Sequence, residues 1–254
     1  ISVYVHIPFC ERACFYCGCN RVITRDRDRV QNYLEGLYKE IQNRAKLHGH
    51  RRVLQLHWGG GTPTYLDHSQ MTELMHELAM NFELDGSESR DFSIEIDPRS
   101  VKYQSIALIR GLGFNRISLG IQDFDPNVQK AINRIQSYES ICELMQEIGK
   151  FDFSSVNFDL IYGLPQQSVK SMEETLERVL ELKPDRIACY NYAHMPDRFP
   201  AQRAIASSEI PSVEEKLQLF ELISRRLAEA GYYHIGLDHF ALVDDELFTA
   251  SKAG

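Results

Sequence analysis

Short apolar runs, rich in β-branched and aromatic residues, alternate along the chain with longer segments of helical periodicity. We expect strands at residues 2–7, 53–58, 92–97, 115–120, 155–161 and 186–192. Helices are expected between and after them, near 28–47, 68–81, 101–111, 138–149, 170–182 and 212–230. Ser69 and Ser168 fit the starts of two of these helices, because serine caps helix N-termini. Six such repeats with short connections predict an α/β fold, with a parallel sheet and outer helices.

Cysteine, glycine or polar residues lie in the last part of every predicted strand or directly after it. The first strand leads into a group of cysteines, and the second leads into Gly59-Gly60-Gly61-Thr62-Pro63. The third strand carries Glu95 and Asp97, and the fourth leads to Gln122 and Asp123. The fifth holds Asp159 and ends at Gly163, and the sixth leads to Asn191 and His194. Parallel α/β sheets place their chemistry at the carboxyl ends of the strands. The pattern therefore predicts a ligand site at the mouth of an open or closed barrel.

Composition excludes several classes of protein. The chain has 254 residues, of which 43% are apolar and 25% charged, as in ordinary globular domains. A net charge of −8 argues against nucleic acid as a partner. No run approaches the ~18 apolar residues of a membrane span, and residues 1–14 do not resemble a signal peptide. We expect a cytoplasmic protein without a membrane partner, and we read the chain as a piece of a longer protein.

Four of the six cysteines fall within ten residues, and three of them, Cys10, Cys14 and Cys17, form C-x3-C-x2-C. Three thiolates at this spacing suit three irons of a 4Fe–4S cluster and leave the fourth iron open. Zinc is the main alternative, with Cys14 and Cys17 as one ligand pair that Cys10 and Cys19 would complete. A group of buried thiols is the third interpretation. Cys19 alone fits a fourth ligand, a redox thiol or a small buried residue.

Other residues fit either a site or ordinary structure. The glycines of residues 59–61 fit a loop that grips a zwitterionic amino-acid group, or simply a tight turn. Glu95 and Asp97 share one face of a strand, as do Tyr4 and His6. The carboxylate of Asp159 lies in an apolar run, where it requires a partner or a ligand.

Taken together, these motifs resemble the radical S-adenosylmethionine (SAM) enzymes. The resemblance rests on YVHIPFC (4–10) with Cys14, Tyr16, Cys17 and Cys19, and on LHWGGGTPTYL (56–66), IEIDPR (94–99), GFNRISLGIQDF (113–124), NFDLIYGLP (157–165), NYAHMP (191–196) and GLDHFA (236–241). It covers essentially the whole chain. Within the superfamily, the chain is most similar to the oxygen-independent coproporphyrinogen III oxidase family. Cys19 favours that family over its haem-chaperone relatives, which usually lack this cysteine.

The resemblance implies a fold, a domain division and a reaction. The fold would be a partial (β/α)6 TIM-like barrel over residues 1–231, with 232–254 beginning a C-terminal module that continues beyond the chain. A 4Fe–4S cluster on Cys10, Cys14 and Cys17 would bind SAM at its open iron and cleave it to a 5′-deoxyadenosyl radical. That radical would start the decarboxylation of two propionates of coproporphyrinogen III to vinyl groups, which yields protoporphyrinogen IX. A flavodoxin or ferredoxin would supply electrons to a monomeric enzyme, and this chain alone is expected to be inactive.

The resemblance also assigns residues to two SAM molecules. The first would contact Tyr4, Gly60, Glu95 and Ala193. The second would contact Tyr16, Gly61, Thr62, Gln122, Arg134 and Asp159. His6 is the best candidate for proton handling beside the substrate, with Tyr4 and Glu95 as further catalytic candidates. Arg21, Arg25 and Arg27 are candidates for holding the propionates.

Three other functions stay open at this point. One is a haem chaperone that binds cluster, SAM and haem without decarboxylation. Another is a radical SAM enzyme acting on RNA, protein or a small metabolite. The last is a zinc-stabilised α/β domain without redox chemistry.

Overall fold

A computed structural model describes residues 1–48 and 51–253, and these form two compact units. The first unit comprises Ile1–Arg12, Cys19–Ile117 and Glu147–Ser154. The second comprises Ala13–Gly18, Ser118–Gln146 and the chain from Ser155 onward. Among the described residues, no helix combines the length and the apolar character needed to cross a bilayer.

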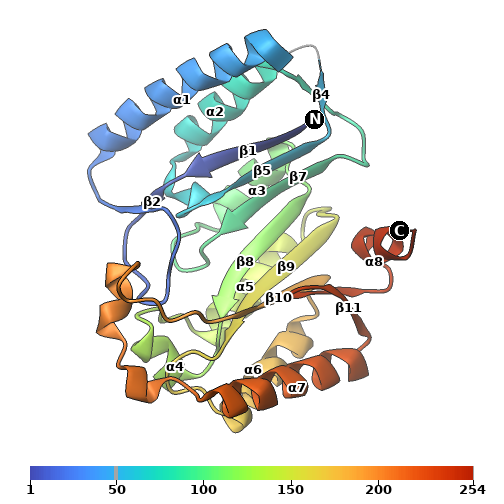
Figure 1. Ribbon diagram of the computed structural model, residues 1–254. Coiled ribbons are helices and arrows are strands. Elements are labelled where there is room, and N and C mark those ends of the chain that lie inside the picture. Colours follow the sequence, from blue (N-terminus) through green and yellow to red (C-terminus); the bar gives the residue numbers. More distant parts are fainter. Residues whose placement is uncertain (49–50, 254) are drawn as a thin grey trace. The chain divides into compact units, whose positions relative to one another are not determined.

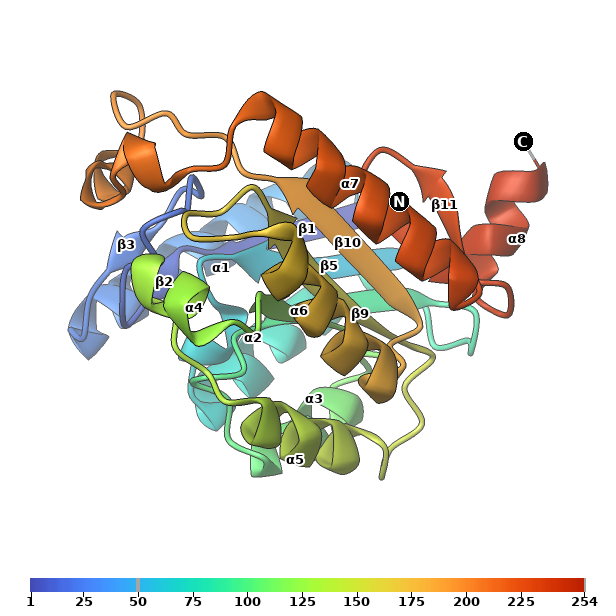
Figure 2. The same ribbon diagram turned by 90° about the horizontal axis from the view of Figure 1, so that it is seen from below.

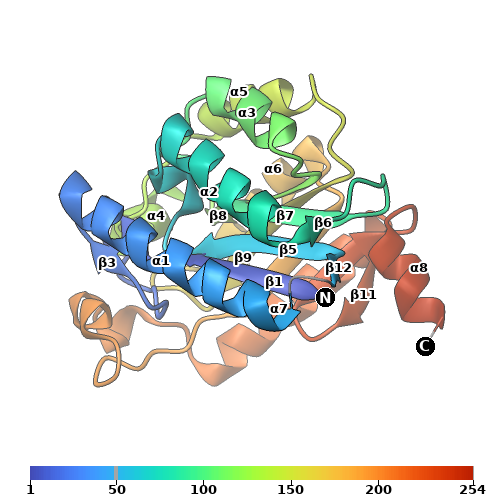
Figure 3. The ribbon, with the colours of Figure 1, turned by 90° about the horizontal axis from the view of Figure 1, so that it is seen from above.

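The first unit is built on three parallel strands, β1 (Ser2–Ile7), β5 (Gln55–Gly60) and β7 (Asp91–Ile96), in the order β1-β5-β7. Its helices are α1 (Arg27–His48), α2 (His68–Asn81) and α3 (Gln104–Gly111). Helices α1 and α2 pack against each other beside β1 and β5 (Figure 1, Figure 3). Shorter elements complete the unit: β2 (Phe9–Cys10), β3 (Val22–Ile23), β4 (Arg52–Val53), the 3-10 turn η1 (Pro63–Tyr65) and β6 (Glu83–Leu84).

Side chains on alternate positions of the strands are buried and form the core of this unit. Every second residue of β7 is buried, and Leu56 and Trp58 of β5 are fully buried. The Trp58 ring meets Phe114 edge to face, with 5.0 Å between the ring centroids. The opposite face of the same strands therefore carries the polar residues, which is the period-2 pattern of a sheet with one face in the core.

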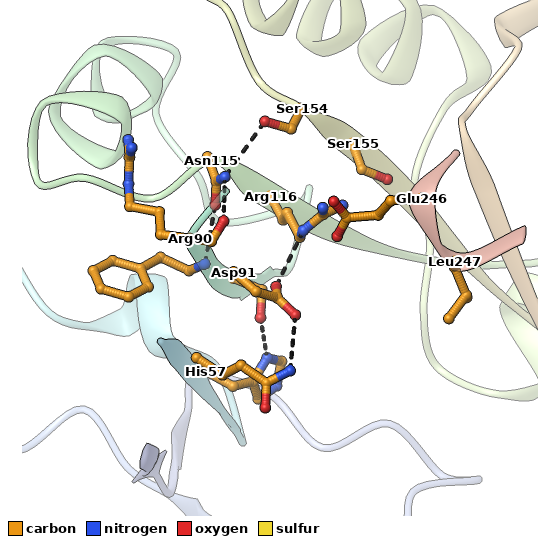
Figure 4. Close-up of polar contacts among 12 residues, drawn as sticks. His57, Arg90, Asp91, Asn115, Arg116, Ser154, Ser155, Glu246 and Leu247 are labelled. Atoms are coloured by element: carbon orange, nitrogen blue, oxygen red, sulfur yellow. Dashed lines mark hydrogen bonds and ion pairs between the residues drawn. The ribbon is translucent and has the colours of Figure 1, made fainter. Parts of the chain in front are cut away.

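Polar clamps hold the amino end of β7. The buried Asn115 accepts a hydrogen bond from the Phe92 N–H at 2.9 Å and donates to the Arg90 carbonyl at 2.7 Å. Arg116 pairs with Asp91 at 3.1 Å (Figure 4). These contacts satisfy backbone groups at the end of the strand that lies away from Glu95.

The second unit contains β8, β9 (Ser155–Tyr162), β10 (Arg186–Asn191), β12 (His239–Leu242) and β11 (Tyr232–Gly236), in that order across the sheet. The strand β8 (Arg116–Gln122) starts at the end of the first unit. Strands β9 and β10 are parallel, and β11 and β12 are antiparallel additions at the edge. Helices α6 (Val169–Leu182) and α7 (Val213–Glu229) pack on each other beside β9 and β10 (Figure 2). The remaining elements are α4 (Pro126–Ala131), α5 (Tyr138–Ile148), η2 (Pro200–Ala204), η3 (Ser207–Glu209) and α8 (Glu246–Ala253).

The structure confirms the α/β class and all six expected strand–helix repeats, with shifted boundaries. The second strand spans 55–60 instead of 53–58, because Val53 belongs to the separate short strand β4 and two glycines extend β5. Ser168 caps α6 as expected, whereas the expected cap Ser69 is wrong. Asp67 caps that helix by accepting from the Gln70 N–H, in a capping box that Gln70 completes.

Among the features absent from the sequence prediction, one helix and one strand pairing stand out. Helix α4 follows Asp125-Pro126, where the Asp125 side chain caps the first turn. Strand β12 pairs with β10, so residues after 231 add to the sheet of the second unit. Whether residues 232–254 begin a further module stays a prediction.

A buried ion pair ties α8 to this sheet and leads to a first prediction. Asp245, 3% exposed at its side chain, accepts hydrogen bonds from Arg186 Nε at 2.9 Å, Ser155 Oγ at 3.1 Å and the Leu247 N–H at 2.7 Å. Burial alone would raise the pKa of Asp245, but these hydrogen bonds, led by those from Arg186, lower it below its ordinary value. A carboxyl with a depressed folded-state pKa stabilises the fold above the unfolded value of about 4 and loses that contribution as pH falls through the folded value.

We therefore expect Asp245→Asn to lower the free energy of unfolding at pH 7 by about 2–3 kcal/mol, because it removes the buried carboxylate that pairs with Arg186. The other ion pair of Arg186, with Glu246 at 3.8 Å, is 62% exposed on the Glu246 side and contributes little. Urea unfolding at pH 7 and at lower pH measures the effect, and the gap from the wild-type chain should narrow below about pH 4. Glu229→Gln is the control: its pair with Arg225 is 57% exposed on both sides, so the change should stay under about 1 kcal/mol. Equal losses in the two variants would refute the assignment.

Candidate active site

Two rows of residues run across one face of the sheet in the first unit, and the second row lies nearer the carboxyl ends of the strands. Tyr4 of β1 lies opposite His57 of β5, which lies opposite Ser93 of β7. The next row on the same face pairs His6 with Gly59. Side chains two apart on a strand share a face, so Tyr4 and His6 project together. Both were predicted as site residues, and the structure brings them together.

Glu95 lies two residues after Ser93 and extends the second row. One carboxylate oxygen, Oε1, accepts from His57 Nε2 at 3.2 Å, and the other, Oε2, accepts from the Gly60 N–H at 3.1 Å. A Cβ at Gly59 would lie 2.7 Å from Oε1. The missing side chain at position 59 is therefore what lets the carboxylate settle over the strand.

Tyr4 and His6 form a hydrogen-bonded pair with an assignable proton order. His6 Nε2 lies 2.8 Å from the carbonyl of Asn20, and a carbonyl only accepts, so Nε2 carries a proton. Nδ1 then accepts from the Tyr4 hydroxyl at 3.0 Å. Partial burial, with added repulsion from Glu95 and Cys19, raises the pKa of Tyr4 above its ordinary value. The Tyr4 hydroxyl therefore stays protonated and acts as a donor.

Gly60 and Gly61 occupy positions where the backbone leaves no room for a side chain. Gly60 has φ of +119°, and a Cβ there would lie 2.8 Å from the His6 ring. A Cβ at Gly61 would lie 2.6 Å from the Pro8 carbonyl oxygen. The Gly61 N–H donates to the Ile7 carbonyl at 2.8 Å, which draws the turn against the end of β1. These glycines make a cradle of bare backbone next to the strand that leads to Cys10.

Cys10 ends β2 at the base of the cysteine loop. Its Sγ lies 3.5 Å from Oγ1 of Thr62, so the first cysteine and the glycine turn are in contact. The parallel pairing of β2 with β3 holds the returning end of the loop, and the Thr24 N–H donates to the Cys10 carbonyl at 3.1 Å. The structure thus joins two predicted site residues, Cys10 and Thr62.

The other two cysteines of the motif belong to the second unit. Cys14 is buried, and the Cys17 N–H donates to its carbonyl at 3.3 Å. Arg134, 5% exposed, donates from Nη1 to Cys14 Sγ at 3.6 Å and from Nη2 to the Gly120 carbonyl at 2.6 Å. A guanidinium therefore faces the sulfur of a predicted cluster ligand.

Asp159 and Gln122, both predicted ligand contacts, lie within β9 and at the end of β8, respectively. Asp159 accepts from Ser118 Oγ at 2.8 Å and from Asn157 Nδ2 at 2.9 Å, which supplies the partners that its apolar run requires. Gln122 has φ of +68°, an uncommon conformation for a residue other than glycine. Such strained residues cluster at functional sites.

Tyr16 and Ala193 are linked by a residue that sequence reasoning missed. The buried Gln202 donates from Nε2 to the Tyr16 carbonyl at 2.9 Å and to the Ala193 carbonyl at 3.1 Å. Tyr16 also packs on the apolar cluster around Ile132 and Tyr192. Gln202 lies in the irregular stretch 193–211, where no periodicity marked it.

His57 is the second missed residue. Its position on the polar face of β5, between Tyr4 and Glu95, is readable only once the register of the strands is known. The sequence offered one signal, which was its place directly before Trp58 and the glycines.

Several predicted residues take structural roles or shift position. Asp97 lies beyond β7 and pairs with Arg99 at 2.6 Å. Arg27 donates to the Tyr65 carbonyl at 2.9 Å and covers the Tyr65 ring, so it already serves the turn after the glycines. Cys19 is exposed, so its interpretation as a small buried residue is wrong.

Asp123 is also a structural residue. It is completely buried and accepts from Gln167 Nε2 at 2.6 Å and from Thr175 Oγ1 at 2.9 Å. Burial raises the pKa of Asp123 to about 6, against the opposing effect of its hydrogen bonds. These partners hold the loop after β8, and the carboxylate has no exposure to a ligand.

Within residues 1–48 and 51–253, no set of three His, Cys, Asp or Glu side chains is already arranged as a metal site. The ligand set Cys10, Cys14 and Cys17 therefore stays a prediction from sequence spacing and resemblance.

Comparison with known proteins gives one family and closely similar relatives. The Radical SAM superfamily matches residues 4–179. An oxygen-independent coproporphyrinogen III oxidase of Pseudomonas aeruginosa is 47% identical over 255 residues, covering all of this chain and 55% of that protein. The Escherichia coli protein of the same name is 46% identical over 254 residues, with the same two coverages. A solved structure of coproporphyrinogen III oxidase from Escherichia coli, described as a radical SAM enzyme, superposes with a TM-score of 0.96 at 46% identity, covering 99% of this chain and 58% of that one.

The chain thus spans about half the length of the curated relatives that it matches.

The glycine cradle gives the second prediction. We expect Gly61→Ala to lower the free energy of unfolding by about 1–3 kcal/mol, because its Cβ would lie within 3 Å of backbone atoms of Pro8 and Phe9. Backbone atoms cannot move away as a flexible side chain can. Gly36→Ala is the matched control. Its Cβ on α1 meets nothing within 4 Å, so helix propensity should raise stability by about 0.5–1 kcal/mol. Denaturant unfolding of both variants measures the contrast, and a stable Gly61→Ala would show that the turn tolerates a side chain.

Proposed function

Because the chain belongs to the radical SAM superfamily, we propose that it is the core of an oxygen-independent coproporphyrinogen III oxidase. One observation carries the proposal. The Glu95 carboxylate is held by His57 and Gly60 beside a turn cleared of side chains, and that turn contacts Cys10 through Thr62. The carboxylate suits the amino group of SAM, and the bare backbone beside it lets the rest of the amino-acid group approach closely. Relatives of the same name, similar over the whole chain, support the substrate assignment.

The residues present fit the implied cofactors. Cys10, Cys14 and Cys17 provide three sulfur ligands, which is the donor type that iron–sulfur clusters use. The cradle at Gly60 and Gly61 is space that any Cβ would fill. When bound, the cluster would supply the electron that cleaves SAM to a 5′-deoxyadenosyl radical.

Residues of the chain would bind and orient the first SAM. Glu95 would accept hydrogen bonds from its amino group, the Gly60 backbone would lie against it, and Tyr4 and Ala193 would be further contacts. A fixed carboxylate is preorganised for a cation, so little ordering is needed on binding. The proposed second SAM would contact Tyr16, Gly61, Thr62, Gln122, Arg134 and Asp159.

Tyr4 and His6 would handle protons beside the substrate. With Nε2 committed to the Asn20 carbonyl, His6 presents Nδ1 to the Tyr4 hydroxyl. A proton could therefore pass between the Tyr4 oxygen and Nδ1 without movement of the ring. The two residues lie beside Glu95, where the reactive end of SAM would be delivered.

The whole reaction would be the oxidative decarboxylation of two propionates of coproporphyrinogen III to vinyl groups, which gives protoporphyrinogen IX. We propose a flavodoxin or ferredoxin as electron donor, a cytoplasmic location and a monomeric state. Arg21, Arg25 and Arg27 stay as candidates for the propionates, and Arg27 also donates to the Tyr65 carbonyl.

The third prediction concerns the cluster. After anaerobic reconstitution we expect about four irons and four sulfides per chain, and an EPR spectrum of the reduced protein that shifts when SAM is added. Cys14→Ala should lose the cluster, whereas Cys142→Ala, on α5 and outside the motif, should keep it. Zinc without sulfide, or a spectrum indifferent to SAM, would overturn the proposal.

The fourth prediction concerns the reaction. The reconstituted full-length protein, with SAM and a low-potential reductant, should convert coproporphyrinogen III to protoporphyrinogen IX, as followed by porphyrin chromatography after oxidation. Haem binding without decarboxylation would identify a haem chaperone instead. Inactivity of the present chain alone would agree with the expectation that the rest of the protein contributes to turnover.

A further inference from the structure

The imidazole ring of His57 contacts three neighbouring side chains. Nε2 lies 3.2 Å from Glu95 Oε1, Nδ1 lies 2.7 Å from Ser93 Oγ, and the ring stacks on Tyr4 with 5.6 Å between centroids and 14° between planes. Two of these partners, Tyr4 and Glu95, are proposed contacts of the first SAM. The function proposed above uses His57 as a contact of Glu95 but assigns it no role in SAM binding.

The hydrogen bonds fix the tautomer of His57. A carboxylate only accepts, so the ring proton lies on Nε2 and points at Glu95. Nδ1 then accepts from the Ser93 hydroxyl, and the order of donation runs from Ser93 through His57 to Glu95. This arrangement matches the way metal-site histidines and carboxylates are oriented by an outer layer of hydrogen bonds.

The pairing of the strands also restricts the position of the His57 side chain. Its Cα lies opposite that of Ser93 on one side and that of Tyr4 on the other, so both neighbours are set by β-sheet register. Tyr4 covers one face of the ring. Of the two Glu95 oxygens, Oε2 is held by the backbone of Gly60, and only Oε1 depends on a side chain.

We propose that His57 is the positioning residue of Glu95: it turns the carboxylate into the orientation that receives the SAM amino group. This inference rests on the proposed function, because it takes Glu95 as the SAM contact. His57 acts through Glu95 and would not touch SAM itself. Loss of the hydrogen bond to Oε1 would leave the carboxylate hinged on Gly60 alone and would weaken SAM binding without changing the cluster.

Two amides test the geometry, because they differ only in reach. The terminal nitrogen of glutamine is as many bonds from Cβ as histidine Nε2, whereas that of asparagine corresponds to Nδ1. His57→Gln should therefore still donate to Glu95, and His57→Asn should not. His57→Phe keeps an aromatic ring for Tyr4 and removes both hydrogen bonds.

The measurement is the dissociation constant of SAM for the reconstituted holoprotein, with iron content and the EPR spectrum of the reduced cluster recorded for each variant. We expect His57→Asn and His57→Phe to weaken SAM binding roughly 10- to 100-fold, and His57→Gln to stay within about threefold of wild type. All three should retain the wild-type iron content. His68→Asn is the control, since it also breaks a histidine–serine bond, to Ser105 at 2.8 Å, outside the site; it should bind SAM normally.

A double-mutant cycle separates positioning from general damage. In a Glu95→Gln background, His57→Asn should have almost no additional effect, because the group that it orients is already lost. Full additivity, or equal SAM affinity in Asn, Gln and wild-type proteins, would refute the role of His57. Failure of the wild-type holoprotein to bind cluster or SAM would instead refute the proposed function.

Discussion

The pairing of β1 with a strand that ends in glycine determines the candidate site. Gly59 and Gly60 continue the ladder of β5 opposite His6 and Ile7, so the backbone stays regular where side chains are excluded. At Gly59 the space is taken by the Glu95 carboxylate, and at Gly60 by the His6 ring. A Cβ at either position would displace a proposed catalytic residue, so strand geometry and chemistry depend on the same two positions.

The same pairing explains why polar residues here are ordered before any ligand binds. Two hydrogen-bonded groups, Tyr4 with His6 and His57 with Ser93 and Glu95, lie on one face of three strands, and the stacked rings of Tyr4 and His57 join them. Sites built on strands hold their groups more tightly than sites built on loops. The cysteine loop differs, since it leaves β2 at Cys10 and returns at β3, and only its two ends are fixed by strand pairing.

Much of this organisation could be predicted from the sequence. Period-2 and helical patterns located six strands and six helices, and the rule that chemistry lies at the ends of parallel strands drew attention to Glu95 and Asp159. The site roles of Tyr4 and His6 came from the family resemblance. Local patterns could not reveal the register. His57 reads as an ordinary polar residue in VLQLHW until β1 and β7 are placed on either side of it.

Capping and burial account for the other differences. Asp67 outcompetes Ser69 as a cap because Gln70 completes a reciprocal pair with it. Gln202 is buried and donates to Ala193, nine residues away, and to Tyr16, which lies 186 residues away in sequence; no periodicity in the irregular stretch between 193 and 211 marks these contacts. Asp123 lies next to Gln122 in sequence, but it points into the interior and binds Thr175 of α6.

The contacts of Asn115 and Arg116 affect which substitutions this chain can accept during evolution. They fasten β7 at its amino end, while Glu95 serves the opposite end of the strand. We expect substitutions at the amino end to alter thermal stability with little effect on chemistry, because in parallel β/α barrels that end of the strands serves stability and the carboxyl end serves the reaction. Adaptation to a different temperature can therefore proceed by substitutions around the amino end of β7, while Glu95 and the glycines at the opposite end of the strands stay unchanged.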